Sequence, residues 1–356
     1  MTTVTLHIGR HKTGTSSIQA TLAANRDLLR SRGVLYPASL PENHSGFFRD
    51  AFAPNPESFP INKHNGLNRE AIQKMARRQL DDVSREFESF QGSHLIFSAE
   101  DACTLPLEGV RNIKKLLDER LSPNKYQIIF YTRHPVSRAL SGIQQNVKGN
   151  GLTLEDAIDF HIRGGGPSYA NITKNFSDVF GESFLKVRAF EAALETPGGP
   201  VVDFFLRSSV DPTDLRQMRR NDSIAAEMVY FLSWLYEGPR HTNNPRLHHR
   251  ATRVPLNDTE RSMLFDIKGA KPNFLSQQEI DFLWNAVESD MAFLERHYGI
   301  AYRKSEATAA GGAHLFTQNF LDQINAVLPS LSTPLQEELS TFFDTQKYVT
   351  NRSRTV

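Results

Sequence analysis

The sequence predicts an α/β fold in which helices cover both faces of a parallel β-sheet, followed by a helical C-terminal extension. Two observations lead to this prediction. Five short apolar stretches with the character of strands alternate with helical stretches, and repeated strand–helix alternation is typical of such sheets. In two places a strand also leads through a polar loop into a helix, and strand ends are where α/β proteins place their ligand sites.

The composition excludes several classes of protein. The chain of 356 residues is 39% hydrophobic and carries 41 Lys and Arg against 40 Asp and Glu, so nothing points to nucleic acid or an anionic membrane as a partner. No stretch approaches the roughly 20 apolar residues of a membrane-spanning helix. The first strand begins at once, so we expect a cytoplasmic protein without a signal peptide. The single cysteine, Cys103, excludes an internal disulfide and is interpreted as a buried structural thiol.

The N-terminal stretch contains a candidate phosphate site. Residues 4–8 form an apolar run that predicts a buried strand, and residues 16–29 predict a helix because their apolar positions share one face. The loop between them contains Gly9, Lys12 and Gly14. Glycines let the backbone fold around an anion, which the free N–H groups and the dipole of the helix start attract.

The spacing of this loop differs from that of nucleoside triphosphatases. In their pattern a lysine directly follows the second glycine, whereas here Thr15 follows Gly14 and Lys12 lies two residues before it. A strand–turn–helix unit with ordinary turn glycines is the alternative interpretation.

A short strand over residues 34–36 leads into a long segment, residues 37–66. This segment carries five prolines and several aromatic residues. It is too long and too apolar for a simple connector, so we interpret it as a lid-like insertion that faces the substrate. His44 lies within it and is either a substrate residue or a solvated loop histidine.

The next two units each place polar residues at the end of a strand. A helix over residues 67–90 and a strand over 93–97 precede Glu100 and Asp101. Carboxylates at a strand end are candidates for chemistry in an α/β protein.

A helix over residues 110–121 and a strand over 126–132 then precede Arg133. Pro135 suits the first turn of a following helix, in which Arg138 and Ser141 share a face because they lie three residues apart. Two guanidinium groups and a hydroxyl at a helix start predict a second anion site. A surface helix with salt-bridging arginines is the alternative.

The remainder predicts one strand, over residues 184–189, and several helices. The helices are predicted over residues 153–162, 201–206, 224–236 and 277–299, the last opened by a capping box of Ser276 and Glu279. The histidines of a polar segment, His241, His248 and His249, lack the spacing and the carboxylate partners of a metal site. We therefore predict no metal.

The C-terminal end has the composition of a linker followed by helices. Residues 304–313 are rich in alanine and glycine, which is typical of a linker. The last 43 residues predict one or two amphipathic helices. These helices either pack on the sheet or make a homodimer contact.

The order of these motifs resembles that of the sulfotransferases that use 3′-phosphoadenosine 5′-phosphosulfate (PAPS). The loop His11-Lys-Thr-Gly-Thr-Ser16 resembles their 5′-phosphosulfate loop in its bacterial form, and Arg133-x-Pro-x-x-Arg-x-x-Ser141 is similar to their 3′-phosphate motif. Ser98-Ala-Glu100 is similar to the acidic base of carbohydrate-type members. The segment Tyr169 to Phe176, the strand end Phe190-Glu191 and the helix start Asn221-Asp-Ser223 also fall in the family's order.

The resemblance covers about residues 4–300 and implies a P-loop-like nucleotide-binding fold. It implies a sulfotransferase domain over residues 1–303, and it leaves residues 304–356 as a linker and a helical extension.

The resemblance also implies the reaction and the role of each residue. PAPS would be the donor, 3′,5′-bisphosphoadenosine the product, and a hydroxyl of a carbohydrate or glycolipid the acceptor, without a metal. Lys12 would neutralise charge on the bridging oxygen as the sulfuryl group leaves. Arg133 and Ser141 would hold the 3′-phosphate, with Arg138 as a helper. The implied donor-binding residues are His11, Lys12, Thr13, Gly14, Thr15, Ser16, Arg133, Arg138 and Ser141.

A hydroxyl acceptor must lose a proton, and Glu100 is the implied base. That role requires hydrogen-bond reach, and we expect burial to raise the pKa of the carboxyl. Asp101 and His44 are the reserve candidates.

Two other functions stay open at this point. A P-loop kinase that uses ATP and Mg²⁺ is opposed by the displaced Lys12. A non-catalytic protein that keeps the nucleotide cradle for binding or regulation is opposed by the presence of both Lys12 and Glu100.

Overall fold

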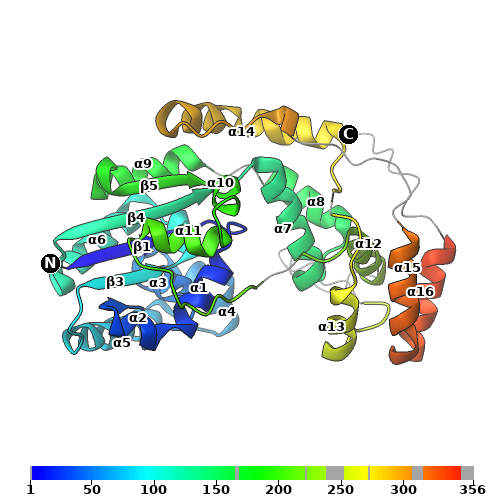
Figure 1. Ribbon diagram of the computed structural model, residues 1–356, viewed down its shortest axis with the longest axis horizontal. Helices are drawn as coiled ribbons and strands as arrows, with labels where there is room; N and C mark the ends of the chain where they lie inside the picture. The colour runs from blue at the N-terminus through cyan, green and yellow to red at the C-terminus, as the bar shows by residue number, and fades with distance from the viewer. Residues whose placement is uncertain are drawn as a thin grey trace. The chain divides into compact units, whose positions relative to one another are not determined.

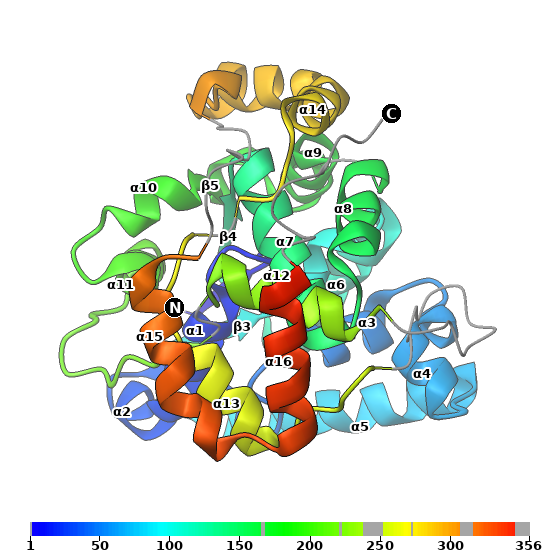
Figure 2. The same cartoon turned by 90° about the vertical axis from the view of Figure 1, so that its right-hand side faces the viewer.

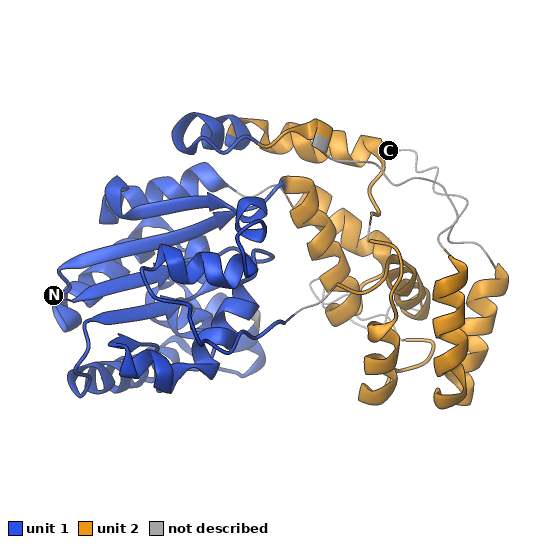
Figure 3. Cartoon of the chain, in the orientation of Figure 1, with its two compact units in different colours: residues 1–134, 168–221, 290–301 blue, residues 135–167, 222–289, 302–356 orange. Residues whose placement is uncertain are grey.

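The computed structural model describes residues 2–164, 168–220, 223–237, 252–271, 273–306 and 316–345 (Figure 1). The chain divides into two compact units (Figure 3). The first unit contains residues 1–134, 168–221 and 290–301, and the second contains residues 135–167, 222–289 and 302–356.

The first unit is built on a five-stranded sheet in the order β2-β3-β1-β4-β5. Every neighbouring pair of strands is parallel, as the alternation of strands and helices predicted. All five predicted strands are confirmed, with ends that differ by at most one residue. The strands are β1 (Thr3–His7), β2 (Val34–Leu35), β3 (His94–Ser98), β4 (Lys125–Thr132) and β5 (Leu185–Ala189).

Helices cover both faces of this sheet, because successive side chains of a buried strand point to opposite faces. On β4, Tyr131 belongs to the apolar cluster that includes Ile18 and Phe204 of the helices on one face. Its neighbour Phe130 contacts Tyr169 on the other face. The first face carries α1 (Thr15–Ala24), α2 (Arg26–Ser31) and α11 (Gly199–Arg207), and the second carries α6 (Leu107–Leu121) and α9 (Tyr169–Phe180).

The helix predicted over residues 16–29 is interrupted. α1 ends at Ala24 and α2 begins at Arg26. Asn25 lies between them, and its side chain donates to the carbonyl of Thr21 and accepts from the backbone N–H of Arg216. Asparagine readily bonds nearby backbone groups in place of continuing a helix, and the partner at residue 216 is far away in the sequence.

The segment predicted to be a lid, residues 37–66, is a packed part of the first unit. It contains α3 (Ser45–Phe52), a 3-10 turn (Pro56–Ser58) and α4 (Pro60–His64). Phe47, Phe48 and Phe52 of α3 are all buried and contact one another edge to face or tilted. The aromatic residues therefore serve the core, and the function of the segment as a lid stays a prediction.

The other elements of the first unit flank these layers. They are α5 (Arg69–Glu88), the 3-10 turns η2 (Glu100–Thr104) and η3 (Glu182–Phe184), and α10 (Phe190–Leu194).

The second unit is helical and is organised around α12 (Ala226–Leu235), all ten residues of which are buried. The helices of this unit are α7 (Pro135–Asn150), α8 (Leu154–Arg163), α12, α13 (Asp258–Asp266), the first part of α14 (Gln277–Tyr298), the 3-10 turns η4 (Lys304–Glu306) and η5 (Leu328–Ser330), α15 (Gln318–Val327) and α16 (Thr333–Thr345).

The C-terminal helices α15 and α16 lie side by side (Figure 2) and share an apolar cluster with α12. The indole of Trp234 also donates to Glu338 of α16. They therefore pack on α12 of the second unit, and the alternative of a homodimer contact stays a prediction. The division into a domain of residues 1–303 and an extension of residues 304–356 stays a prediction.

Several predictions fall on residues outside the described ranges. These are the histidines His241, His248 and His249, residues 307–313 of the predicted linker, and Asn221-Asp222 of the predicted helix start. Within the described ranges, every helix is too short or too polar to span a bilayer.

Candidate functional site

The predicted site residues of the first unit follow the carboxyl ends of parallel strands, which meet at one edge of the sheet. The loop with Lys12 follows β1, Glu100 and Asp101 follow β3, and Arg133 follows β4. β1 lies between β3 and β4 in the sheet. The chain thus brings together three strand ends at the place where ligands bind in open α/β sheets.

The loop between β1 and α1 has an unusual backbone. Lys12 has a φ of 74° and Gly14 a φ of 75°, in the left-handed region that few residues other than glycine adopt. The hydroxyl of Thr13 donates to the carbonyl of Arg10 at 2.6 Å and braces the turn. Gly9 is required for close packing, because a Cβ there would lie 2.5 Å from Cγ2 of Thr15.

The start of α1 offers backbone donors to an anion. Gly14 is the N-cap, and no side chain caps the helix. The N–H groups of Ser17 and Ile18 donate to the Gly14 carbonyl, whereas the first N–H groups of a helix have no intrahelical acceptor. Within the described chain the Ser16 hydroxyl has no hydrogen-bond partner. These groups fit a phosphate.

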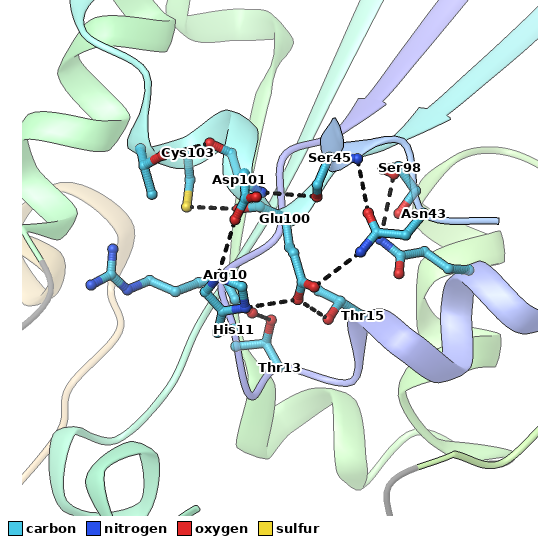
Figure 4. Close-up of polar contacts among 12 residues, drawn as sticks. Arg10, His11, Thr13, Thr15, Asn43, Ser45, Ser98, Glu100, Asp101 and Cys103 are labelled. Atoms are coloured by element: carbon cyan, nitrogen blue, oxygen red, sulfur yellow. Dashed lines mark hydrogen bonds and ion pairs between the residues drawn. The ribbon is translucent and has the colours of Figure 1, made fainter. Parts of the chain in front are cut away.

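Glu100 is held by three side chains from two segments, His11 and Thr15 of the β1–α1 segment and Asn43 before α3 (Figure 4). Its Oε2 accepts from the Thr15 hydroxyl at 2.6 Å and lies 3.2 Å from Nδ1 of His11. Its Oε1 accepts from the Asn43 amide at 3.2 Å. Nε2 of His11 lies 3.1 Å from Oδ1 of Asp101. The predicted donor loop and the predicted base are therefore in direct contact.

These contacts change the pKa of both partners. Burial alone raises the pKa of Glu100, but the hydrogen bonds from His11, Thr15 and Asn43 outweigh it and lower the pKa to about 2. The expectation of a raised pKa for Glu100 is therefore wrong, because the hydrogen-bond donors outweigh the effect of burial. The hydrogen bonds to Asp101 and Glu100 raise the pKa of His11 to about 9.

Arg133 is joined to the donor loop. Its guanidinium donates to the Lys12 carbonyl at 2.5 Å and lies over the ring of Phe190, 5.2 Å from the ring centroid. The Tyr169 hydroxyl accepts from the Arg133 backbone N–H and donates to its carbonyl. Arg133 thus fixes the backbone at the strained Lys12 position, a contact that the sequence did not suggest.

The other two residues of the second predicted anion motif, Arg138 and Ser141, are half-buried on α7. α7 begins at Pro135, as predicted, and belongs to the second unit, whereas Arg133 belongs to the first. Their role in holding the 3′-phosphate stays a prediction.

His44 occupies the core of the first unit. It is fully buried and stacks on Tyr36 with a centroid distance of 4.4 Å, and its Nδ1 accepts from the Ser98 backbone N–H. Burial lowers its pKa to about 3, so the ring is neutral. This placement fits neither a solvated loop histidine nor direct contact with a substrate, and it favours a structural role.

Asn43 and Gln19 also belong to this site, although the sequence did not indicate them. The Asn43 carbonyl oxygen accepts from Nε2 of Gln19 and from the Ser45 backbone N–H, which turns its amide nitrogen toward Glu100. No spacing in the sequence connects these residues, since they come from separate segments. Asn43 stands among other polar residues in the sequence, so no local signal marked its role.

Cys103 is buried, as predicted, and its thiol contacts the carbonyl of Glu100. Burial raises the pKa of this thiol to about 11. Across the described ranges, no cluster of three or more His, Cys, Asp or Glu side chains is arranged to hold a metal ion.

Comparisons with known proteins give only distant likenesses. No family model matches the chain, and no curated protein matches it. Among solved structures, a sulfotransferase from Alicyclobacillus acidocaldarius is 20% identical over 61% of this chain and 85% of its own, with a TM-score of 0.41. The sulfotransferase domain from the curacin biosynthetic pathway is 10% identical over 81% and 97%, with a TM-score of 0.36.

A third structure, the sulfotransferase domain from the olefin synthase of Synechococcus PCC 7002, is 13% identical over 80% of this chain and 93% of its own, with a TM-score of 0.32. Likenesses at these TM-scores are too weak to assign a function. The residues of the site must carry the assignment.

Proposed function

We propose that this protein transfers a sulfuryl group from PAPS to a hydroxyl acceptor, a carbohydrate or a glycolipid. The observation that carries the proposal is the hydrogen bond of 2.6 Å between Thr15 at the start of α1 and Glu100 at the end of β3. It joins a phosphate-binding loop to a carboxylate base. A donor bound in the loop and an acceptor hydroxyl beside Glu100 would therefore lie close together, as transfer of the sulfuryl group requires.

The donor would be held by the loop and the start of α1. The first N–H groups of α1, with the free hydroxyl of Ser16, suit the 5′-phosphate. Lys12 would stabilise the negative charge that develops on the bridging oxygen. The motif of Arg133, Arg138 and Ser141 is proposed to bind the 3′-phosphate, as its sequence suggests.

The reaction breaks the bond between sulfur and the bridging oxygen of the donor and forms a bond between sulfur and the acceptor oxygen. The hydroxyl proton of the acceptor passes to Glu100. With a pKa of about 2, Glu100 is ionised at neutral pH but is a weak base. We therefore expect proton transfer to follow formation of the new sulfur–oxygen bond, when the hydroxyl has become acidic.

Calorimetric titration tests the donor site. We expect 3′,5′-bisphosphoadenosine to bind more tightly than ATP with Mg²⁺, and Arg133→Ala to abolish that preference. Lys115→Ala, at a strongly exposed lysine of α6, is the control for Arg133→Ala and should keep the preference. Preference for ATP with Mg²⁺ would favour the kinase, and binding of neither nucleotide would remove the donor site.

One observation favours the non-catalytic alternative. Glu100 is already engaged by three side chains, which suits a structural carboxylate as well as a base. Turnover separates the two functions. A non-catalytic protein would bind the bisphosphate and yet transfer no radiolabelled sulfuryl group from PAPS to any carbohydrate or glycolipid in an acceptor panel.

A further inference from the structure

His11 forms a bridge between two carboxylates. Its Nδ1 lies 3.2 Å from Oε2 of Glu100, and its Nε2 lies 3.1 Å from Oδ1 of Asp101. A neutral imidazole has a single N–H, so it can donate to one carboxylate only. Both contacts are favourable together only when the ring carries two protons. The geometry therefore requires an imidazolium between ionised Glu100 and Asp101.

The contacts of Glu100 leave one acceptor position open. An ionised carboxylate has about four lone-pair positions, two on each oxygen. Thr15 and His11 occupy those of Oε2, and Asn43 occupies one on Oε1. The orientation of the Asn43 amide is set by the Ser45 backbone N–H, which can bond only its oxygen. The second position on Oε1 is the one left for a proton from the acceptor.

We propose that His11 is a positioning residue that acts through Glu100. Its imidazolium holds Oε2 of the Glu100 carboxylate against the donor loop, and this leaves Oε1 to receive the proton of the acceptor. The inference rests on the proposed role of Glu100 as the base. It gives the His11 side chain a task other than binding the donor, because both of its ring nitrogens face carboxylates.

Other titratable groups lie near this pair and must be considered. Asp101 and Cys103 lie on η2, and Arg10 lies on the loop beside His11 and acts on Cys103. His7 on β1 is buried and senses the charge of Glu100, and its pKa is lowered to about 4 by burial. His7 is thus neutral above that pH. His11 is therefore the ring near Glu100 that carries a positive charge at neutral pH.

Proton NMR titration of the His11 ring tests the bridge without any donor. We expect its pKa near 9 in the wild-type protein, against an ordinary 6.5, and a fall toward 6.5 in the double variant Glu100→Gln, Asp101→Asn. The resonance is assigned by its loss in His11→Gln. A wild-type pKa close to 6.5 would overturn the proposal.

The pH dependence of kcat/KM then separates positioning from simple structural support. In His11→Gln the cation is lost, so the pKa of Glu100 should rise from about 2 toward or above 4.5. The acid limb of the kcat/KM profile should therefore shift to higher pH. His11→Lys restores a cation and should shift the acid limb back toward the lower pH of the wild-type protein. The exposed His297 serves as control, and His297→Gln should leave the profile unchanged.

The two experiments fail in distinguishable ways. If the NMR titration gives a high His11 pKa but no acceptor is sulfated, the proposed function fails and the bridge stands. If sulfation is found and the acid limb does not respond to the charge at residue 11, the positioning role is wrong and the proposed function stands.

Discussion

At the scale of single residues, the site depends on pairs that the sequence keeps far apart. Thr15 and Glu100 are 85 positions apart, and their hydrogen bond is 2.6 Å long. Asn43 comes from a further segment, whereas His11 lies in the same β1–α1 segment as Thr15. Glu100 therefore has a pKa of about 2, which neither its burial nor its place at a strand end would indicate.

Replacement of Glu100 by glutamine should remove the base and leave the fold. Gln keeps the shape and can still bond Thr15 and Asn43, but its amide cannot take a proton from an acceptor. We expect kcat for sulfuryl transfer to fall by about 10²–10⁴-fold, measured as release of 3′,5′-bisphosphoadenosine with the acceptor that the panel identifies.

The control for this variant is Glu119→Gln, on an exposed glutamate of α6. Near-wild-type kcat in Glu100→Gln, with binding of the bisphosphate intact, would show that another group is the base.

At the scale of elements, the β1–α1 connection requires glycine at residue 9. A Cβ in Gly9→Ala would lie 2.5 Å from Thr15 Cγ2 and 3.1 Å from the His7 ring. The loop would have to shift, so we expect a loss of about 1–3 kcal/mol in the free energy of unfolding together with weaker binding of the bisphosphate. Urea unfolding and calorimetry measure the two effects.

Gly46→Ala is the matched control, because a Cβ at this helical position meets nothing closer than 3.7 Å. Alanine is the better helix former, so this variant should not be destabilised. Equal effects of the two substitutions would show that the close contact at Gly9 is not responsible.

A second element-scale feature is Asp203, which ties α11 to the sheet. Its carboxylate is nearly buried, pairs with Arg188 of β5 at 2.7 Å and accepts from the Tyr131 hydroxyl of β4 at 2.8 Å. Asp203→Ala would leave the Tyr131 hydroxyl without its acceptor and Arg188 without its ion pair. The Arg188 guanidinium would keep its hydrogen bonds to Ala192 and Thr196. We expect a loss of about 3 kcal/mol in urea unfolding, the low end for a buried pair because Arg188 is 28% exposed.

Asp178→Ala on the exposed side of α9 supplies the comparison for Asp203→Ala. If both variants unfold at the same urea concentration, the ion pair does not hold α11 on the sheet.

At the scale of the whole molecule, the C-terminal helices belong to the second unit. Phe342 of α16 is 3% exposed and contacts the rings of Phe231 and Trp234 on α12. Phe342→Ala should cost about 3–5 kcal/mol through the cavity it leaves. The loss should appear in the unfolding of the second unit, followed by tryptophan fluorescence of Trp234.

Phe282→Ala, at a position that is 55% exposed, is the control for Phe342→Ala. An unchanged transition in Phe342→Ala would mean that α16 is not part of this core.

The strands and their order along the chain could be predicted from the sequence, because five apolar runs separated by helical stretches leave little choice of fold class. The sequence also predicted the local chemistry of the 9–16 loop and the start of α7 at Pro135. These features depend on neighbouring residues only, and side-chain periodicity and loop residues report on them directly.

The remaining features of the fold and the site could be seen only in the tertiary structure. It divided the chain into two interleaved units, buried His44 in the core, broke the first helix at Asn25 and surrounded Glu100 with donors. Each of these results depends on contacts between residues that are distant in the sequence, as in the hydrogen bond that the Arg216 backbone N–H donates to the Asn25 side chain. Hydrophobic patterning indicates whether a residue is buried, but it does not indicate which distant residue that side chain contacts.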